Sequence, residues 1–218
     1  MSNSSRSTSS SQSPVTPKLG AKAEVILAAA LQEFLKTGYM GTSLDRIAKA
    51  AQVSKPTLYS YFNDKASLFE AVVQQQLMIL SQDATSLPLA PDPSLAPHQL
   101  LTLVLNRLLD RMLSNTDQHH KIIRLLLGES GRFPNLAQHL VSSIHKPVID
   151  RLTYLLANHP QIHCADPALT ASTLLGSLVY YVMTQRMLQS ATILPLDRAA
   201  YVQNLVNLVV PTSSVSLD

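Results

Sequence analysis

Residues 42–65 read TSLDRIAKAAQVSKPTLYSYFNDK, and this stretch decides the fold because it predicts two short helices joined by a tight turn. Apolar residues recur at three- and four-residue spacing in the first helix, at Leu44, Ile47, Ala48 and Ala51. One face of that helix is therefore expected to lie on a core. Thr42, three residues before Asp45, is expected to cap its N-terminus.

The second helix is predicted from about Lys55 to Phe62, with Ser54 as its N-cap and Pro56 in the first turn, where no backbone N–H is needed. Leu58 and Phe62 lie one turn apart and are expected to face the core. The remaining positions carry a lysine, hydroxyl groups and tyrosines, which are nucleic-acid-contacting residue types. Spacing alone also allows an ordinary helical hairpin with solvated polar residues.

The residues expected to contact DNA are Thr42, Ser43, Ser54, Lys55, Pro56, Thr57, Tyr59, Ser60, Tyr61 and Lys65. Among them Lys55, Thr57 and Tyr59 are assigned to the groove, since a helix N-terminus can reach base edges. Thr42, Tyr61 and Lys65 are assigned to phosphate oxygens.

Residues 24–70 resemble the DNA-binding domain of the tetracycline-repressor (TetR) family along their whole length. The resemblance includes F-x-x-x-G-Y-x-x-T/S beginning at Phe34, the Ile47–Ala48 pair, and V-S-K-P-T-L-Y-x-Y-F-x-x-K-x-x-L-F over residues 53–69. One position departs from the family, because Gln52 stands where A-G-V-S usually has glycine. If Gln52 takes a positive φ there, a small strain cost follows.

Composition bounds the class of protein. The chain has 218 residues, of which 46% are hydrophobic, enough for one sizeable core or two smaller ones. Up to Lys65 there are eight Lys and Arg against four Asp and Glu, a net charge of +4, so the basic excess lies where a polyanion would bind. Cys164 is the single cysteine, and no run of apolar residues is long enough to cross a membrane. We therefore expect a soluble cytoplasmic protein with no membrane partner.

The whole chain is predicted to be all-α with about nine helices and no strand pattern. Residues 1–18 are expected to form a disordered Ser-rich arm, 19–65 a helix-turn-helix DNA-binding domain, and 66–211 an effector-binding and dimerisation domain. Gly38 is expected to end the first helix, and Asn63 or Asp64 to cap a fourth that runs to about Leu80. Later helices are expected over residues 98–114, 117–128, 134–158, 167–189 and 197–210, with a kink or split at Pro147.

The last two helices are apolar on more than one face, which indicates burial on both sides. A homodimer interface is expected at Leu174, Leu178, Tyr181, Val182, Tyr201, Leu205 and Leu208, although burial in a single-chain core remains an alternative. The TetR resemblance also implies dimerisation, which would place two recognition helices on a pseudo-palindromic operator with half-sites about 34 Å apart.

The same resemblance implies a small-molecule effector in the C-terminal domain. Candidate ligand residues are polar or aromatic positions on otherwise apolar helices, namely Arg107, Arg111, His120, Arg124, Glu129, His145, Tyr180, Met183 and Arg186. Residues 124–136, RLLLGESGRFPNL, resemble the C-terminal domain of one broad TetR subgroup, which supports the fold without naming a ligand. The Leu and Met content suits a long hydrophobic or amphipathic effector.

No catalytic or nucleotide-binding motif appears, and we predict no enzyme activity, cofactor or metal. His159 to Cys164, HPQIHC, holds possible ligands, but Pro160 disfavours the helix that would align them. The leading hypothesis is a homodimeric one-component transcriptional regulator, most often a repressor in this family, that an effector releases from its operator. The alternatives are a helical adaptor that docks proteins on the headpiece and a His-dependent metalloenzyme.

Overall fold

The computed structural model of the protein describes residues 20–85, 94–114 and 117–211. Over these residues the chain is helical and contains no strand, which confirms the all-α prediction. When helical segments that follow one another without a break are joined, this part of the chain forms nine helical runs. The predicted disordered arm, residues 1–18, lies outside the described residues.

Helices α1 (Ala21–Gly41), α2 (Leu44–Ala50) and α3 (Lys55–Tyr61) form the headpiece. Gly38 interrupts α1 with a φ of 72°, a left-handed conformation that glycine adopts without a steric penalty. The cap of α2 differs from the prediction: Ser43, not Thr42, is the N-cap, and its side chain accepts a hydrogen bond from the Arg46 N–H. The Thr42 hydroxyl is used inside the headpiece instead.

The turn between α2 and α3 has the strained backbone that the sequence indicated. Gln52 has a φ of 56°, in the left-handed region, and is followed by Val53, which packs against the headpiece core. The Val53 N–H donates to the Ala48 carbonyl oxygen over 3.0 Å, which helps to hold the turn. Ser54 then caps α3 by accepting from the Thr57 N–H, as predicted.

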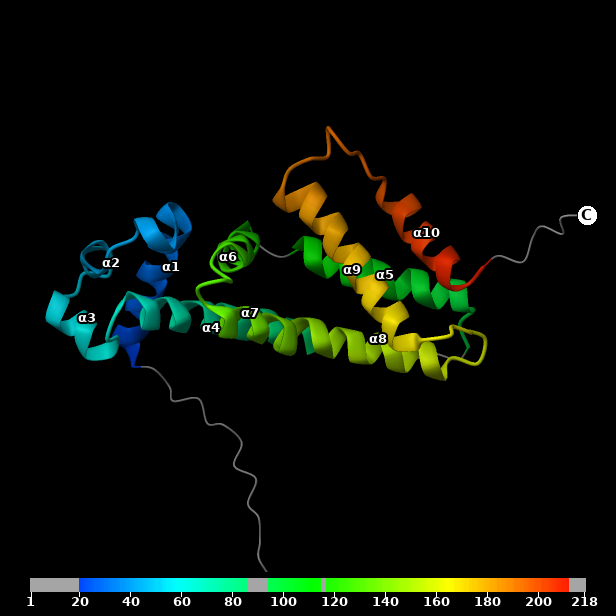
Figure 1. Ribbon diagram of the computed structural model, residues 1–218, viewed down its shortest axis with the longest axis horizontal. Coiled ribbons are helices and arrows are strands. Elements are labelled where there is room, and N and C mark those ends of the chain that lie inside the picture. Colours follow the sequence, from blue (N-terminus) through cyan, green and yellow to red (C-terminus); the bar gives the residue numbers. More distant parts are fainter. Residues whose placement is uncertain (1–19, 86–93, 115–116, 212–218) are drawn as a thin grey trace, which may run out of the picture.

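Helix α4 (Lys65–Thr85) leads out of the headpiece and runs alongside the C-terminal helices (Figure 1). Asp64 caps it, as the sequence allowed: its carboxylate accepts from the Ser67 N–H at 2.7 Å, and the Ser67 hydroxyl accepts from the Asp64 N–H. These bonds to the charged form hold the pKa of Asp64 below its usual value. Helix α4 extends about one turn further than predicted.

The C-terminal part contains α5 (Pro97–Ser114), α6 (Asp117–Gly128), α7 (Pro134–Leu140), η1 (Val141–His145), α8 (Lys146–Asn158), α9 (Pro167–Val182), η2 (Met183–Met187) and α10 (Arg198–Val209). The segments η1 and η2 are single π-helical turns. Pro147, which has no N–H to donate one turn back, follows η1, so the predicted split takes the form of a π turn between α7 and α8.

Two apolar cores hold the described chain together. The first joins the headpiece to α4, α6 and α7, and the second lies among α5, α8, α9 and α10. Ile144, on the π turn η1, packs against both. The headpiece core therefore continues past the predicted domain boundary at residue 65, and the division of the chain into domains stays a prediction.

Four aromatic rings form the centre of the first core, at Phe34, Tyr39, Phe69 and Phe133. Phe133 comes from the loop between α6 and α7, and its ring centroid lies 4.8 Å from that of Phe69 and 5.1 Å from that of Tyr39. The contact with Tyr39 is edge-on and that with Phe69 is tilted, and aromatic contacts of this kind add to the stabilisation from the apolar area that the rings bury. One side chain of the C-terminal part thus completes the core of the headpiece.

We predict that Phe133→Ala lowers the free energy of unfolding by about 3–5 kcal/mol, because it leaves a ring-sized cavity between Tyr39 and Phe69. Urea unfolding measures this change. Phe133→Leu, which fills most of the space, should cost clearly less. Equal losses of stability in the two variants would show that packing in the ring cluster is not the cause.

Candidate nucleic-acid interface

Helix α3 presents most of its side chains to solvent. Lys55, Pro56, Ser60 and the two tyrosines are exposed, and Tyr59 and Tyr61 each keep 43% of their surface accessible. The inward face carries Leu58, which is fully buried, and Phe62 is buried just after the helix, as predicted. A short helix with a buried anchor and an outer face of hydroxyl, phenol and ammonium groups is a suitable nucleic-acid reader.

In the DNA-free protein the Lys55 ammonium already has a partner. Its Nζ lies 2.7 Å from Asp45 Oδ1, and both side chains are exposed. The hydrogen bond to the Asp45 carboxylate raises the pKa of Lys55, so the side chain carries its charge at neutral pH. Asp45 was not predicted to take part in this site. A phosphate or base edge must compete with it for the ammonium.

Several hydroxyl groups on this face are held locally. Ser54 Oγ lies 2.7 Å from Thr57 Oγ1, and the Ser60 hydroxyl donates to the Thr57 carbonyl oxygen. Ser43 is the cap of α2 and stays exposed. These bonds fix the orientation of the serines and of Thr57, so the outer face of α3 has a defined shape before binding.

Thr42 does not reach the surface. It is 3% exposed, and its hydroxyl lies 2.7 Å from the Gly38 carbonyl oxygen and 2.9 Å from the Thr37 hydroxyl. The Thr42 hydroxyl therefore donates a hydrogen bond to a carbonyl oxygen at the place where Gly38 interrupts α1. The Thr42 hydroxyl is thus not displayed toward a phosphate in this structure, and the contact of Thr42 with DNA stays a prediction.

The Lys65 side chain also has partners that the sequence did not predict. Its Nζ donates to the carbonyl oxygens of Tyr39 at 2.9 Å and Thr42 at 3.0 Å, and lies 4.6 Å above the Tyr39 ring. A cation on these carbonyls satisfies backbone acceptors that α1 leaves open. Lys65 therefore links α4 to the end of α1, and its contact with a phosphate stays a prediction.

Tyr39 lies between two cations. The Arg132 guanidinium carbon lies 5.3 Å from its ring centroid, and Arg132 also pairs with Glu129. Burial raises the pKa of the Tyr39 hydroxyl, although Arg132 opposes this shift. The sequence placed Arg132 in a subgroup motif but did not predict this contact with the headpiece.

The predicted ligand residues do not gather at one place. Arg107 and Tyr180 are exposed, Arg111, Met183 and Glu129 are partly exposed, and Arg124 donates to the Met187 carbonyl oxygen. His145 is partly buried, and desolvation lowers its pKa. His120 and Arg186 are brought together, since both line one cavity.

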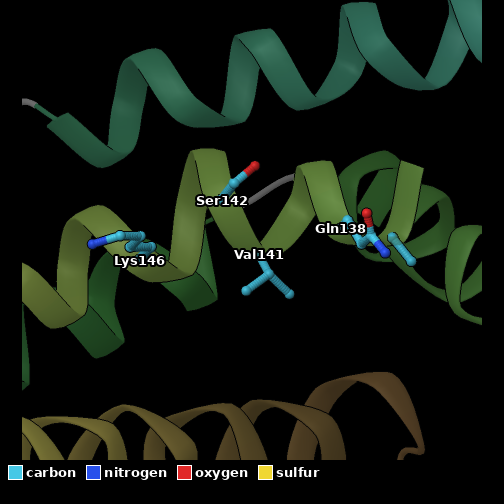
Figure 2. Close-up of a pocket in the computed structure, with 5 residues that line it drawn as sticks. Gln138, Val141, Ser142 and Lys146 are labelled. Atoms are coloured by element: carbon cyan, nitrogen blue, oxygen red, sulfur yellow. The ribbon is translucent and has the colours of Figure 1, made fainter. Parts of the chain in front are cut away.

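The hollows in the described part of the chain include two of similar volume. A cavity of about 420 Å³ lies between the start of α6 and η2, lined by Asp117, His120, Gln185, Arg186 and Gln189. A second hollow of about 440 Å³ is open to solvent and follows a single run of helix, at Ala137, Gln138, Val141, Ser142 and Lys146 (Figure 2). Apart from His120 and Arg186, the sequence predicted none of these residues, because cavities depend on how distant helices meet.

The predicted dimer contacts lie in the chain's own core instead. Leu174, Leu178, Tyr181, Val182 and Leu205 are all at most 7% exposed and pack within the second core. Tyr201 is partly buried, and its hydroxyl donates to the Ser177 carbonyl oxygen. Only Leu208 of the predicted set presents its side chain outward. The apolar surface that a partner could use is therefore a different face of the same two helices.

Among the described residues no three His, Cys, Asp or Glu side chains lie close enough to hold a metal ion. His159, from the HPQIHC stretch, is buried, and both ring nitrogens face backbone partners: the Leu95 carbonyl oxygen and the Gln161 N–H. No helix in the same part of the chain is long and apolar enough to cross a membrane.

Both the headpiece and the C-terminal part of the chain match known protein families. Residues 26–72 match the family described as bacterial regulatory proteins, tetR family. Residues 113–210 match the family described as AefR-like transcriptional repressor, C-terminal domain. The chain belongs to the TetR family. Its headpiece is the helix-turn-helix domain of that family.

Individual proteins of the TetR family are also similar to this chain. The HTH-type transcriptional repressor SCO4008 of Streptomyces coelicolor is 32% identical over 104 residues, 48% of this chain and 47% of that protein, so the match spans about half of the relative's length. The uncharacterized HTH-type transcriptional regulator YhgD of Bacillus subtilis is 26% identical over 70% of this chain and 78% of its own. The solved structure of the flavonoid-responsive regulator FrrA is 28% identical and covers 87% of this chain and 93% of that one, with a TM-score of 0.61.

We predict that Lys65→Met lowers the free energy of unfolding by about 1–3 kcal/mol, because it removes the ammonium that bonds the Tyr39 and Thr42 carbonyl oxygens at the end of α1. Lys36→Met, at an exposed lysine of α1, is the matched control and should change stability little. Urea unfolding gives both values. Unchanged stability in Lys65→Met, together with a flatter salt dependence of DNA binding, would return Lys65 to the phosphate contacts.

Proposed function

We propose that this TetR-family protein is a sequence-specific one-component transcriptional regulator in the cytoplasm. In this proposal it is a homodimeric repressor that a small-molecule effector releases from a pseudo-palindromic operator, and it has no catalytic role. The observation that carries the proposal is the outer face of α3, where Lys55, Tyr59 and Tyr61 are exposed on a helix anchored by buried Leu58.

The charge of the headpiece supports DNA as its partner. Basic residues exceed acidic ones in the chain up to Lys65, and Lys49 adds an exposed ammonium on α2 beside the reading helix. In the free protein the Lys55 ammonium and the Asp45 carboxylate neutralise each other, and DNA must break this ion pair to contact Lys55. Binding should therefore depend on salt and on the charge at residue 45.

Exposed apolar side chains on α9 and α10 support dimerisation through these helices. Leu169 is 66% exposed, Tyr180 44% and Leu208 71%. Leu169, Gly176 and Tyr180 share one side of α9, and open space lies above Gly176, so another helix can approach closely there. We assign the partner-facing surface to this outer face of α9 and α10.

Release by an effector requires differential binding. A ligand lowers operator affinity only if it prefers one of two forms of the dimer. It must bind the form that cannot span both half-sites more tightly than it binds the form found on DNA. FrrA, a relative with the same fold, is named as flavonoid-responsive, which favours a small molecule as the signal here too. Helix α4 is the element that could transmit it, because it belongs to the headpiece core and also contacts α6, α7 and α8.

We predict that selection from random duplexes enriches a pseudo-palindrome and that Lys55→Ala weakens binding to it by about tenfold. The slope of log affinity against log salt should fall by about 1 for each phosphate that the variant no longer neutralises. Asp45→Asn should have the opposite effect and raise affinity several-fold, because it frees the Lys55 ammonium.

Operator binding in these variants is measured by fluorescence anisotropy at several salt concentrations. Lys36→Ala, at an exposed lysine of α1 away from α3, is the control. If no duplex is enriched, the headpiece is a protein-docking surface and the adaptor hypothesis replaces this one. If duplexes are enriched but neither Lys55 nor Asp45 affects affinity, α3 is not the reader.

We predict that the double variant Tyr180→Glu, Leu208→Glu is monomeric by sedimentation velocity, because it buries like charges opposite one another in a two-fold interface. Tyr154→Glu, at a tyrosine on α8 that is 60% exposed, should leave the dimer intact. Circular dichroism checks the fold of both. A double variant that remains dimeric and folded would place the interface elsewhere.

A further inference from the structure

Every residue that lines the cavity between α6 and η2 is polar or charged. Its five lining residues, Asp117, His120, Gln185, Arg186 and Gln189, come from the first turn of α6 and from the end of the α9–η2 run. Its volume of about 420 Å³ is within the range of small-molecule sites. These two elements are tied at one edge by the hydrogen bond from Arg124 Nη1 to the Met187 carbonyl oxygen, 2.9 Å long.

Arg186 supplies a cation that the described residues do not pair. The one acidic wall residue, Asp117, is engaged elsewhere: its Oδ2 lies 2.6 Å from Lys121 Nζ, and this bond keeps the carboxyl ionised and its pKa below the usual value. With that carboxylate neutralised by Lys121, the guanidinium of Arg186 leaves a positive charge at the cavity. A guanidinium can hold a planar oxyanion through two parallel hydrogen bonds.

The other walls add directed hydrogen-bonding groups. His120 Nε2 lies 3.1 Å from the Met112 carbonyl oxygen, which can only accept, so Nε2 is the donor and Nδ1 is left for a ligand. Gln185 Nε2 donates to the Leu194 carbonyl oxygen at 2.9 Å, which fixes the side chain. A ligand that combines a carboxylate with a hydroxyl or amide group would satisfy these walls.

The backbone of this wall is unusual. Arg186 and Gln185 lie on the π turn η2, a geometry that often occurs at functional sites. Gln189 has a φ of 52° and, with Gln52 of the DNA-binding turn, is one of two non-glycine residues with positive φ among those described. Such conformations persist only where the surrounding structure enforces them.

We propose that the cavity between α6 and η2 is the effector site and that it binds a small organic carboxylate, whose charged group is held by Arg186. The inference rests on the proposed function, because it identifies the ligand class and the place where that ligand acts. It also replaces the long hydrophobic effector that composition suggested, since no wall of this cavity is apolar.

The cavity is one residue away from a contact that joins α6 to the headpiece. Gln118 lies between Asp117 and His120, and its amide bridges α1 and α4, with Gln32 Nε2 donating to Gln118 Oε1 and Gln118 Nε2 donating to Gln76 Oε1, both at 3.4 Å. Gln76 is buried. A ligand that draws the first turn of α6 toward η2 would lengthen these two weak bonds and alter how the headpiece is held.

The test is calorimetric titration of the full-length protein with 4-hydroxybenzoate and adipate, each compared with its neutral amide. We expect saturable one-to-one binding of at least one carboxylate and none of the amides. Arg186→Gln should weaken that binding by about 10- to 100-fold, as expected when a charge-assisted bidentate interaction is removed. Arg107→Gln, at an exposed arginine that lines neither hollow, should leave the dissociation constant unchanged.

Operator affinity is then measured with and without the bound carboxylate. It should fall several-fold in the wild type and stay unchanged in Gln118→Ala, which should still bind the carboxylate. Absence of any carboxylate binding, or binding that Arg186→Gln leaves intact, overturns the site. A protein that binds carboxylate but no selected duplex instead overturns the proposed function, so the two failures are distinct.

Discussion

Burial of the Phe133 ring in the headpiece is the contact on which the arrangement of the molecule depends. The loop that carries it connects α6 to α7, yet its ring packs against both Tyr39 of α1 and Phe69 of α4, which also contact each other. Arg132 places a cation against the same tyrosine, and Lys65 approaches that ring from the start of α4. Because these groups meet on one residue of α1, the orientation of the reading helix is set jointly by the N- and C-terminal parts.

The local features of the fold could be predicted from the sequence because local interactions determine them. Capping by Ser54 and Asp64, the break at Gly38 and the bounds of α6 depend on residues a few positions apart. The positive φ of Gln52 followed from the family resemblance, in which glycine is usual at that place. Choosing Thr42 over Ser43 as a cap failed because two adjacent hydroxyls fit the pattern, and one of them is buried in the core.

The site residues that the sequence did not reveal depend on contacts between distant segments. Lys65 is of a residue type that contacts phosphates, but carbonyl oxygens of α1 and its C-cap, 26 and 23 residues earlier in the chain, occupy its ammonium group. The apolar faces of α9 and α10 were predicted to be buried on more than one side, whereas the chain itself covers one side of these helices, and the sequence did not indicate which. Gln185 and Gln189 carried no signal, since only the meeting of η2 with α6 makes them walls of a cavity.

The two apolar cores meet at Ile144, which sits on the π turn and packs against both. Each core has its own set of helices, and the shared residue is only partly buried. Cooperative unfolding requires that disruption of one core destabilises the other, and here α4 of the first core also contacts α8 of the second, while Arg124 of α6 bonds the Met187 carbonyl oxygen. The unbroken helix through η1 and these contacts couple the core of α5, α8, α9 and α10 to the core of the headpiece, so loss of packing in one weakens support for the other.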